Sequence, residues 1–214
     1  MADFNEDADV NTATAPGSRI DAADLSIWKE GRIPSRRGDR GYNAVFLGWN
    51  RAEQRDAKLQ PSYAITLPEG AAANWKLNRD SALVLSLAAL DQDAPRLNEK
   101  DDDKKKDPPK DKKARESPDF TVELTASGGI AVARPLSLFG TVPPPLKVRF
   151  TKLAILDHFA YDKPSEPVFQ SISLPLAAFS EVNPKFDGAA LKTIRFRFNR
   201  TARSAILLSK VGFE

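Results

Sequence analysis

The chain has 214 residues, of which 41% are hydrophobic, and it contains no cysteine. These values allow one domain with a sizeable core, and they exclude a disulfide framework, a thiolate metal site and a cysteine nucleophile. The 32 basic and 29 acidic residues leave a net charge of +3, a modest excess that argues against a nucleic-acid partner.

Segments rich in β-branched and aromatic residues recur along the chain and predict strands. They are residues 43–49, 61–67, 83–87, 120–125, 146–150, 168–174, 193–198 and 205–213. Helical periodicity is scarce: residues 20–30 and 188–194 could each hold a turn or two, with Asp21 and Asp187 as N-caps. Many short strands without intervening helices predict an all-β protein, a sandwich or barrel. We expect a single domain over residues 1–214.

The segment 98–119 interrupts this pattern with a run of charge. It holds eight basic and eight acidic residues, three prolines and no aromatic residue, so it cannot bury enough apolar surface to fold. Strand-like sequence precedes it at 82–88 and follows it at 119–125. We therefore expect a long disordered loop inserted between two strands of one domain.

Near the C-terminus, basic and aromatic residues alternate in one short stretch. Ile194, Phe196 and Phe198 fall on one face of a strand, and Arg195 and Arg197 fall on the other. Such a pattern suits a sheet that binds nucleic acid, but RNA-binding sheets carry glycine-rich motifs and a βαβ layout that this sequence lacks. The stretch is better interpreted as a half-buried sandwich strand with its rings in the core.

Sequence support for catalysis is weak. His158 is the one histidine of the chain, so a metal site with several imidazoles is excluded. The sequence contains no G-x-S-x-G elbow, no P-loop and no G-x-G-x-x-G. We expect no enzyme and no cofactor. The acidic residues Asp3, Glu6, Asp7 and Asp9 could supply oxygen ligands for calcium, but their spacing does not match an EF-hand.

No apolar run approaches the roughly 20 residues that span a bilayer, so we expect no membrane partner. The acidic residues 1–10 contain no apolar segment of the signal-peptide kind. Met1 is the one methionine of the chain, and we expect a module cut from a larger protein.

Residues 172–213 resemble the closing part of galactose-binding-like jelly-roll modules. The motif runs through Ile172, Pro175, Leu176 and Phe179, then Asp187, Leu191, Ile194 and Phe196, and ends at Ile206, Val211 and Phe213. The opening, residues 4–17, is similar to the start of the same modules. The whole chain resembles the non-catalytic, carbohydrate-binding-module-like region that follows the catalytic domain of bacterial secreted hydrolases.

This resemblance implies a jelly-roll β-sandwich that is secreted or periplasmic as part of a larger protein. It also implies a structural calcium between the acidic N-terminal segment and the last strand. Ser209 and Lys210 stand where those modules often carry acidic residues, and a lysine opposes a cation. A calcium site is therefore doubtful, and no other cofactor is expected.

The sequence supports two main hypotheses of function. The first is an accessory module that binds carbohydrate or a related polymer, because exposed aromatic rings stack on sugars and arginines serve acidic or hydroxylated ligands. The candidate ligand-binding residues are Trp28, Tyr42, Trp75, Arg36, Arg37 and Arg40. Trp49 ends a strongly apolar segment and is expected in the core. The alternative is a structural module that packs on its own catalytic domain without an external ligand.

Overall fold

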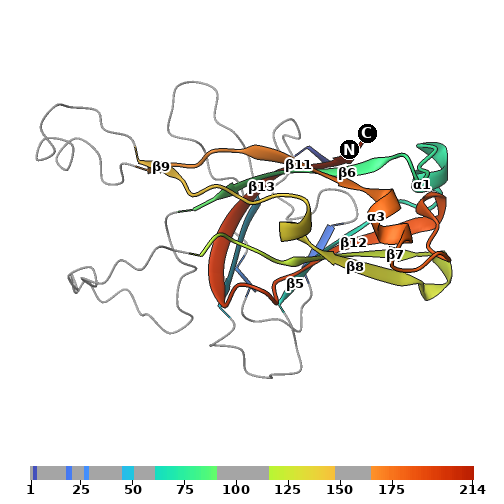
Figure 1. The fold of residues 1–214 in the computed structure, drawn as a ribbon, viewed down its shortest axis with the longest axis horizontal. Helices are drawn as coiled ribbons and strands as arrows, with labels where there is room; N and C mark the ends of the chain where they lie inside the picture. Colours follow the sequence, from blue (N-terminus) through green and yellow to red (C-terminus); the bar gives the residue numbers. More distant parts are fainter. Residues whose placement is uncertain are drawn as a thin grey trace, which may run out of the picture.

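A computed structural model describes residues 2–3, 18–20, 27–28, 45–50, 61–90, 116–147 and 165–214. Figure 1 shows that the described strands form two layers, with the short helices α1 (Ala71–Asn74) and α3 (Leu176–Ser180) at one end. Every strand pairing in the described part of the chain is antiparallel. The predicted all-β sandwich is confirmed.

The first layer, sheet A, has the strand order β11-β6-β13-β4-β3, and β1 also pairs with β13. Its strands are β1 (Ala2–Asp3), β3 (Ile27–Trp28), β4 (Val45–Asn50), β6 (Ala82–Ala89), β11 (Gln170–Pro175) and β13 (Arg203–Phe213). The second layer, sheet B, has the order β2-β5-β12-β7-β8. Its strands are β2 (Ser18–Ile20), β5 (Ser62–Thr66), β7 (Thr121–Ala126), β8 (Ala131–Pro135) and β12 (Leu191–Arg197).

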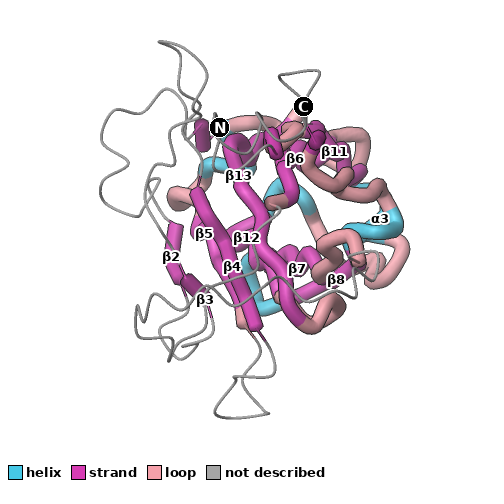
Figure 2. The backbone as a smooth tube through the Cα atoms, turned by 90° about the vertical axis from the view of Figure 1, so that its left-hand side faces the viewer, coloured by secondary structure: helices cyan, strands magenta, loops and turns pink. Residues whose placement is uncertain are grey.

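The chain crosses between the two sheets repeatedly. β4, β5, β6 and β7 alternate between sheet A and sheet B, and so do β11, β12 and β13. Each crossing places the apolar face of one strand against the apolar face of the next, which is how a jelly-roll-like sandwich builds one core. A separate pair, β9 (Leu146–Lys147) and β10 (Ser165–Glu166), joins neither sheet. Figure 2 shows α3 beside β8 at the edge of sheet B.

Sequence reasoning missed two strands of sheet B, β2 and β8, and misplaced two helical turns. β8 has the sequence AVARP, whose single β-branched residue and proline give little strand signal. The predicted helical turn over 188–194 is wrong beyond Ala190, because a 3-10 turn over Gly188–Ala190 passes directly into β12. Asp187 does cap that turn, since its Oδ1 accepts a hydrogen bond from the amide of Ala189 at 2.9 Å. In the predicted helical segment 20–30, Ile20, Ile27 and Trp28 belong to strands, and the other residues lie outside the described ones.

The core between the sheets contains the aromatic rings that the alternating pattern predicts. Trp49, Phe120, Phe196 and Phe198 have exposed fractions of 0–1%. Trp49 stacks on Phe198 with ring centroids 4.4 Å apart, and Phe120 meets Phe198 edge to face at 5.5 Å. The indole N–H of Trp49 donates to the carbonyl of Thr201 at 2.9 Å, so its one polar group is satisfied. The phenylalanines of β12 and the loop after it are therefore core residues, as predicted.

We expect Gly188→Ala to lower the free energy of unfolding by about 1–3 kcal/mol. A Cβ at Gly188 would lie 2.9 Å from the Leu176 Cδ1 and 3.5 Å from the Asn78 carbonyl oxygen. Thermal denaturation of both chains measures the difference. Gly140→Ala is the matched control, since its Cβ would meet nothing closer than 3.4 Å. Equal loss of stability in the two variants would contradict the close approach at Gly188.

Candidate functional site: the polar face of sheet B

The outer face of sheet B carries polar and small side chains arranged in register across three strands. We call this surface the polar face; its residues are Ser62, Ala64 and Thr66 of β5, Thr193, Arg195 and Arg197 of β12, and Thr121, Glu123 and Thr125 of β7. On β7 and β12 the neighbouring residues face the core, so period-two alternation sends these side chains outward. On β5 the side chains of Ser62 and Ala64 are 3% and 4% exposed, so this strand is buried on both faces there. The opposite side chains of β7 and β12 are buried.

Three rows cross the polar face. In the first, Thr193 pairs with Thr66 on one side and with Thr125 on the other. In the second, Arg195 lies between Ala64 and Glu123. In the third, Arg197 lies between Ser62 and Thr121. The charged groups therefore lie in the second and third rows, with both arginines on the middle strand β12, and hydroxyl groups lie in the first and third rows.

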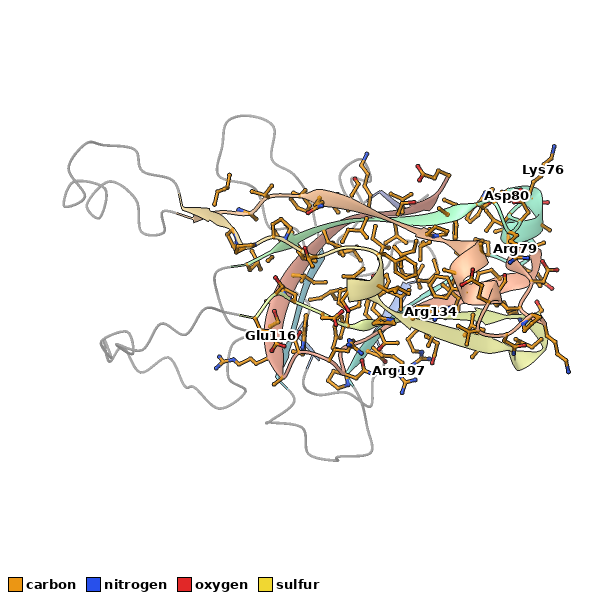
Figure 3. All side chains as sticks on the ribbon, in the orientation of Figure 1. Lys76, Arg79, Asp80, Glu116, Arg134 and Arg197 are labelled. Atoms are coloured by element: carbon orange, nitrogen blue, oxygen red, sulfur yellow. The ribbon has the colours of Figure 1, made fainter. Side chains whose placement is uncertain are left out.

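Glu123 holds the two arginines together. Its Oε2 accepts a hydrogen bond from the Arg197 Nη1 at 3.0 Å, and its Oε1 lies 3.7 Å from the Arg195 Nε. The Arg195 Nη1 also donates to the Ser62 Oγ at 3.2 Å. One carboxylate thus orients two guanidinium groups from a neighbouring strand. Arg197 points away from the sandwich on the sheet B side (Figure 3).

The arginines are more exposed than the carboxylate between them. The side chains of Arg195 and Arg197 are 35% and 36% exposed, whereas Glu123 is 19% exposed. At one end of the face the Thr121 hydroxyl donates to the Asn199 Oδ1 at 2.8 Å. This arrangement offers oriented N–H donors beside threonine hydroxyl groups, a combination that can bind a polar, hydroxyl-rich ligand.

Trp75 is the one predicted stacking residue whose side chain the structure describes. It follows α1, is 45% exposed, and its ring lies 6.0 Å from the Phe213 ring at an interplanar angle of 38°. Phe213 belongs to β13 of sheet A, so Trp75 covers one end of the core there. Its ring contact is with sheet A, whereas Arg195 and Arg197 belong to sheet B.

The other predicted ligand-binding residues lie where the structure describes no side chains. Trp28 is in β3 as the register partner of Gly48. Arg36, Arg37, Arg40 and Tyr42 lie outside the described residues. His158 lies outside them as well.

The structure places Ala2 and Asp3 beside the last strand, β13. In β1, Asp3 is the register partner of Lys210 of β13, while Glu6, Asp7 and Asp9 lie outside the described residues. No group of three or more histidine, cysteine, aspartate or glutamate side chains within the described ranges could hold a metal ion.

Sequence reasoning found part of the polar face and missed its centre. The alternation in β12 predicted that Arg195 and Arg197 face outward. The partners of Glu123 were not predicted, because it lies 74 residues from Arg197 in sequence. A hydrogen bond between strands so distant in the chain depends on sheet order and register.

Comparison with known proteins shows the fold but no family. No protein-family model matches the chain, and no curated protein matches its sequence. An exo-β-agarase structure matches 100% of this chain and 25% of its own length, with a TM-score of 0.52 at 8% identity. This chain therefore spans a quarter of that protein and shares a sandwich fold with it.

Two carbohydrate-binding modules of Clostridium thermocellum are also similar. The family 30 module of a cellulosomal cellulase has a TM-score of 0.46 at 11% identity, over 89% of this chain and 92% of the module. The family 11 module, in complex with a β-1,3-1,4-mixed-linked tetrasaccharide, has a TM-score of 0.47 at 8% identity, over 91% of this chain and 85% of the module.

Within the described ranges, none of the helices has the length and apolar character that crossing a membrane requires.

Proposed function

We propose that this chain is a non-catalytic accessory module that binds carbohydrate through the polar face of sheet B. The observation that carries this proposal is the pair of partly exposed guanidinium groups that Glu123 orients beside the threonines of β7 and β12. Each guanidinium has five N–H donors in a rigid fork, and adjacent sugar hydroxyls are acceptors that such a fork can bind. Orientation before binding lowers the entropy cost of forming those hydrogen bonds.

The shape of the polar face also suits a chain of sugars. Thr66, Thr193 and Thr125 run across three strands, and neighbouring strands lie about 4.8 Å apart. A row of three strands is therefore about 10 Å wide, which is the span of about two sugar rings.

An accessory module of this kind would act for an attached hydrolase in a secreted or periplasmic protein. The polymers for a first test are agarose, because the similar exo-β-agarase is named for that substrate, and mixed-linked β-glucan as a second neutral polymer. Trp28, Tyr42 and Trp75 remain proposed stacking residues, and Arg36, Arg37 and Arg40 remain proposed polar contacts.

The double variant Arg195→Gln/Arg197→Gln is expected to weaken polysaccharide binding about tenfold or more, since each lost hydrogen bond to a charged group is worth about 1.5 kcal/mol or more. Affinity electrophoresis through gels cast with each polymer measures the change. Lys185→Gln is the matched control, because it removes an exposed charge from the loop after α3 and should leave the retardation unchanged. Thermal denaturation checks that the variants remain folded.

Trp75→Ala separates the two proposed kinds of contact. Unchanged retardation in this variant, together with loss in the arginine double variant, places binding on the polar face. Loss of retardation in Trp75→Ala, together with unchanged retardation in the arginine double variant, places binding at the exposed Trp75 ring. Retardation of the parent chain by no polymer would contradict the proposal altogether.

The second candidate function is a structural module that packs on its own catalytic domain. Exposed apolar side chains in the described part of the chain favour it: Trp75 is 45% exposed, Val182 49% and Leu138 56%. Exposed apolar patches mark interaction surfaces when they are contiguous. This candidate function becomes the better supported of the two if the parent chain binds no polymer.

A further inference from the structure

The turn that follows α1 holds a lysine in a backbone conformation that favours glycine. The Lys76 amide donates to the Ala73 carbonyl at 2.9 Å. The Leu77 amide donates to the Ala72 carbonyl at 3.0 Å. This pair of hydrogen bonds is the Schellman pattern that closes many helices, and the left-handed position within it is usually a glycine. Lys76 occupies that position with a φ of 56°.

Elsewhere the described part of the chain uses glycine for this conformation. Within those ranges Lys76 is the one non-glycine residue with a positive φ, and the other residues are Gly70, Gly128 and Gly129. A residue with a Cβ is disfavoured there, so the turn by itself does not explain a lysine. Packing and pairing do not explain it either, because Lys76 is exposed and its ammonium makes no ion pair or hydrogen bond in the described part of the chain. Residues held in unfavourable backbone conformations cluster at functional sites.

The residue before Lys76 is the exposed Trp75. Its ring is tilted by 38° against the partly buried Phe213 ring, with centroids 6.0 Å apart. Ala72 and Leu77, on either side of this stretch, are 2% and 4% exposed, so the core anchors the turn at both ends. Figure 3 shows Lys76 extending away from this end of the sandwich. An exposed aromatic ring and a cation thus occupy consecutive positions on an anchored turn.

The charges that follow in the same turn balance each other. Arg79 and Asp80 carry opposite charges, and Figure 3 shows both at the same end of the sandwich as Lys76. Residues 75–80 therefore carry one positive charge in excess. At the end of β13, the Glu214 carboxylate accepts a hydrogen bond from the Ser173 hydroxyl at 2.9 Å. The turn thus matches a ligand that brings one negative charge together with an apolar face.

We infer that the Trp75–Lys76 turn is a second ligand subsite, which binds one uronic acid residue of a polysaccharide. The apolar face of the sugar ring stacks on the Trp75 indole. The sugar carboxylate pairs with the Lys76 ammonium, which has three N–H donors. This inference rests on the proposed carbohydrate function and adds to the polar face a subsite of different chemistry. Glycine would relieve the backbone at this position but would remove the cation.

The test is a titration of the whole ¹⁵N-labelled chain with D-galacturonate, followed by NMR on the indole N–H signal of Trp75. Trp75→Phe assigns that signal among the three tryptophans of the chain. We expect a saturable shift, with an affinity about fivefold or more tighter than for D-galactose, which lacks the carboxylate. Acetate, which lacks the sugar ring, should give no saturable shift. Equal affinities for galactose and galacturonate would overturn the inference.

Variants of Lys76 separate the cation from the backbone. Lys76→Gly relieves the left-handed conformation, so it should raise the Tm by about 2 °C or more and weaken galacturonate binding about fivefold. Lys76→Arg keeps the charge and should retain the affinity. Lys185→Gln removes an exposed lysine from the loop after α3 and, as the matched control, should change neither quantity. A Lys76→Gly chain that is less stable than the parent, or that binds galacturonate equally well, would contradict the role of the lysine.

The outcomes separate the subsite from the proposed function. If galacturonate gives no saturable shift at Trp75 but neutral polymers retard the chain and the arginine double variant loses that retardation, the subsite fails and the polar face stands. Galacturonate binding at Trp75 without retardation by agarose or β-glucan would keep the subsite and remove the polar face as a carbohydrate site. If neither is observed, both the inference and the proposed function fail.

Discussion

Replacement of Phe198 with alanine is expected to lower the free energy of unfolding by about 3–5 kcal/mol. The ring is fully buried, stacks on Trp49 at 4.4 Å and meets the edge of Phe120 at 5.5 Å. Its removal leaves a cavity between the two sheets that the neighbouring strands cannot close. Urea denaturation followed by tryptophan fluorescence measures the loss.

Two further variants make the Phe198 result interpretable. Phe198→Leu restores most of the volume and should cost less than the alanine variant. Trp75→Ala removes a ring of which 45% is already exposed, so it should cost less than Phe198→Ala. A stability of Phe198→Ala within about 1 kcal/mol of the parent chain would contradict the core packing. It would also revive the hypothesis that the rings of this stretch contact nucleic acid.

Thr201→Val is expected to destabilise the sandwich by about 1–3 kcal/mol. Thr201 is 3% exposed, and its hydroxyl accepts a hydrogen bond from the Asp119 amide at 2.7 Å. The same hydroxyl lies 3.1 Å from the Asp119 carbonyl, to which it donates. Valine has the same shape as threonine but leaves the Asp119 amide without this partner. Thermal denaturation measures the difference.

The Thr201 hydroxyl is part of a cluster that joins the start of β7 to the loop after β12. The Asp119 carboxylate accepts hydrogen bonds from the Ser137 hydroxyl at 2.9 Å and the Ser137 amide at 3.1 Å, and it pairs with Arg200. Thr201→Ser is the control, since it keeps the hydroxyl and loses one methyl group. A valine variant as stable as the serine variant would show that the hydroxyl contributes nothing measurable.

This cluster also defines where the charged segment ends. The sequence predicts a disordered loop over 98–119, and residues 98–115 lie outside the described ones. Residues 116–119 are described, Pro118 is buried, and Asp119 makes the contacts above. The donors to the Asp119 carboxylate come from the 3-10 turn that holds Ser137 and from Arg200 in the loop after β12.

Sequence reasoning predicted only part of the candidate site. The outward position of Arg195 and Arg197 follows from alternation within one strand. The contact of both with Glu123 follows from the pairing of β12 with β7. Sequence context predicted that Trp49 lies in the core, and it is fully buried, whereas Trp75, proposed for stacking, is 45% exposed.

The sequence by itself determined the all-β class, the inward faces of β7 and β12, and the cap at Asp187. These are properties of a few consecutive residues, because strand alternation has a period of two and a cap acts within one turn. The tertiary structure alone decided the order of strands in each sheet, the edge strand β8, and the meeting of Glu123 with two arginines. These depend on register between strands far apart in the chain, which is set by the packing of the whole sandwich.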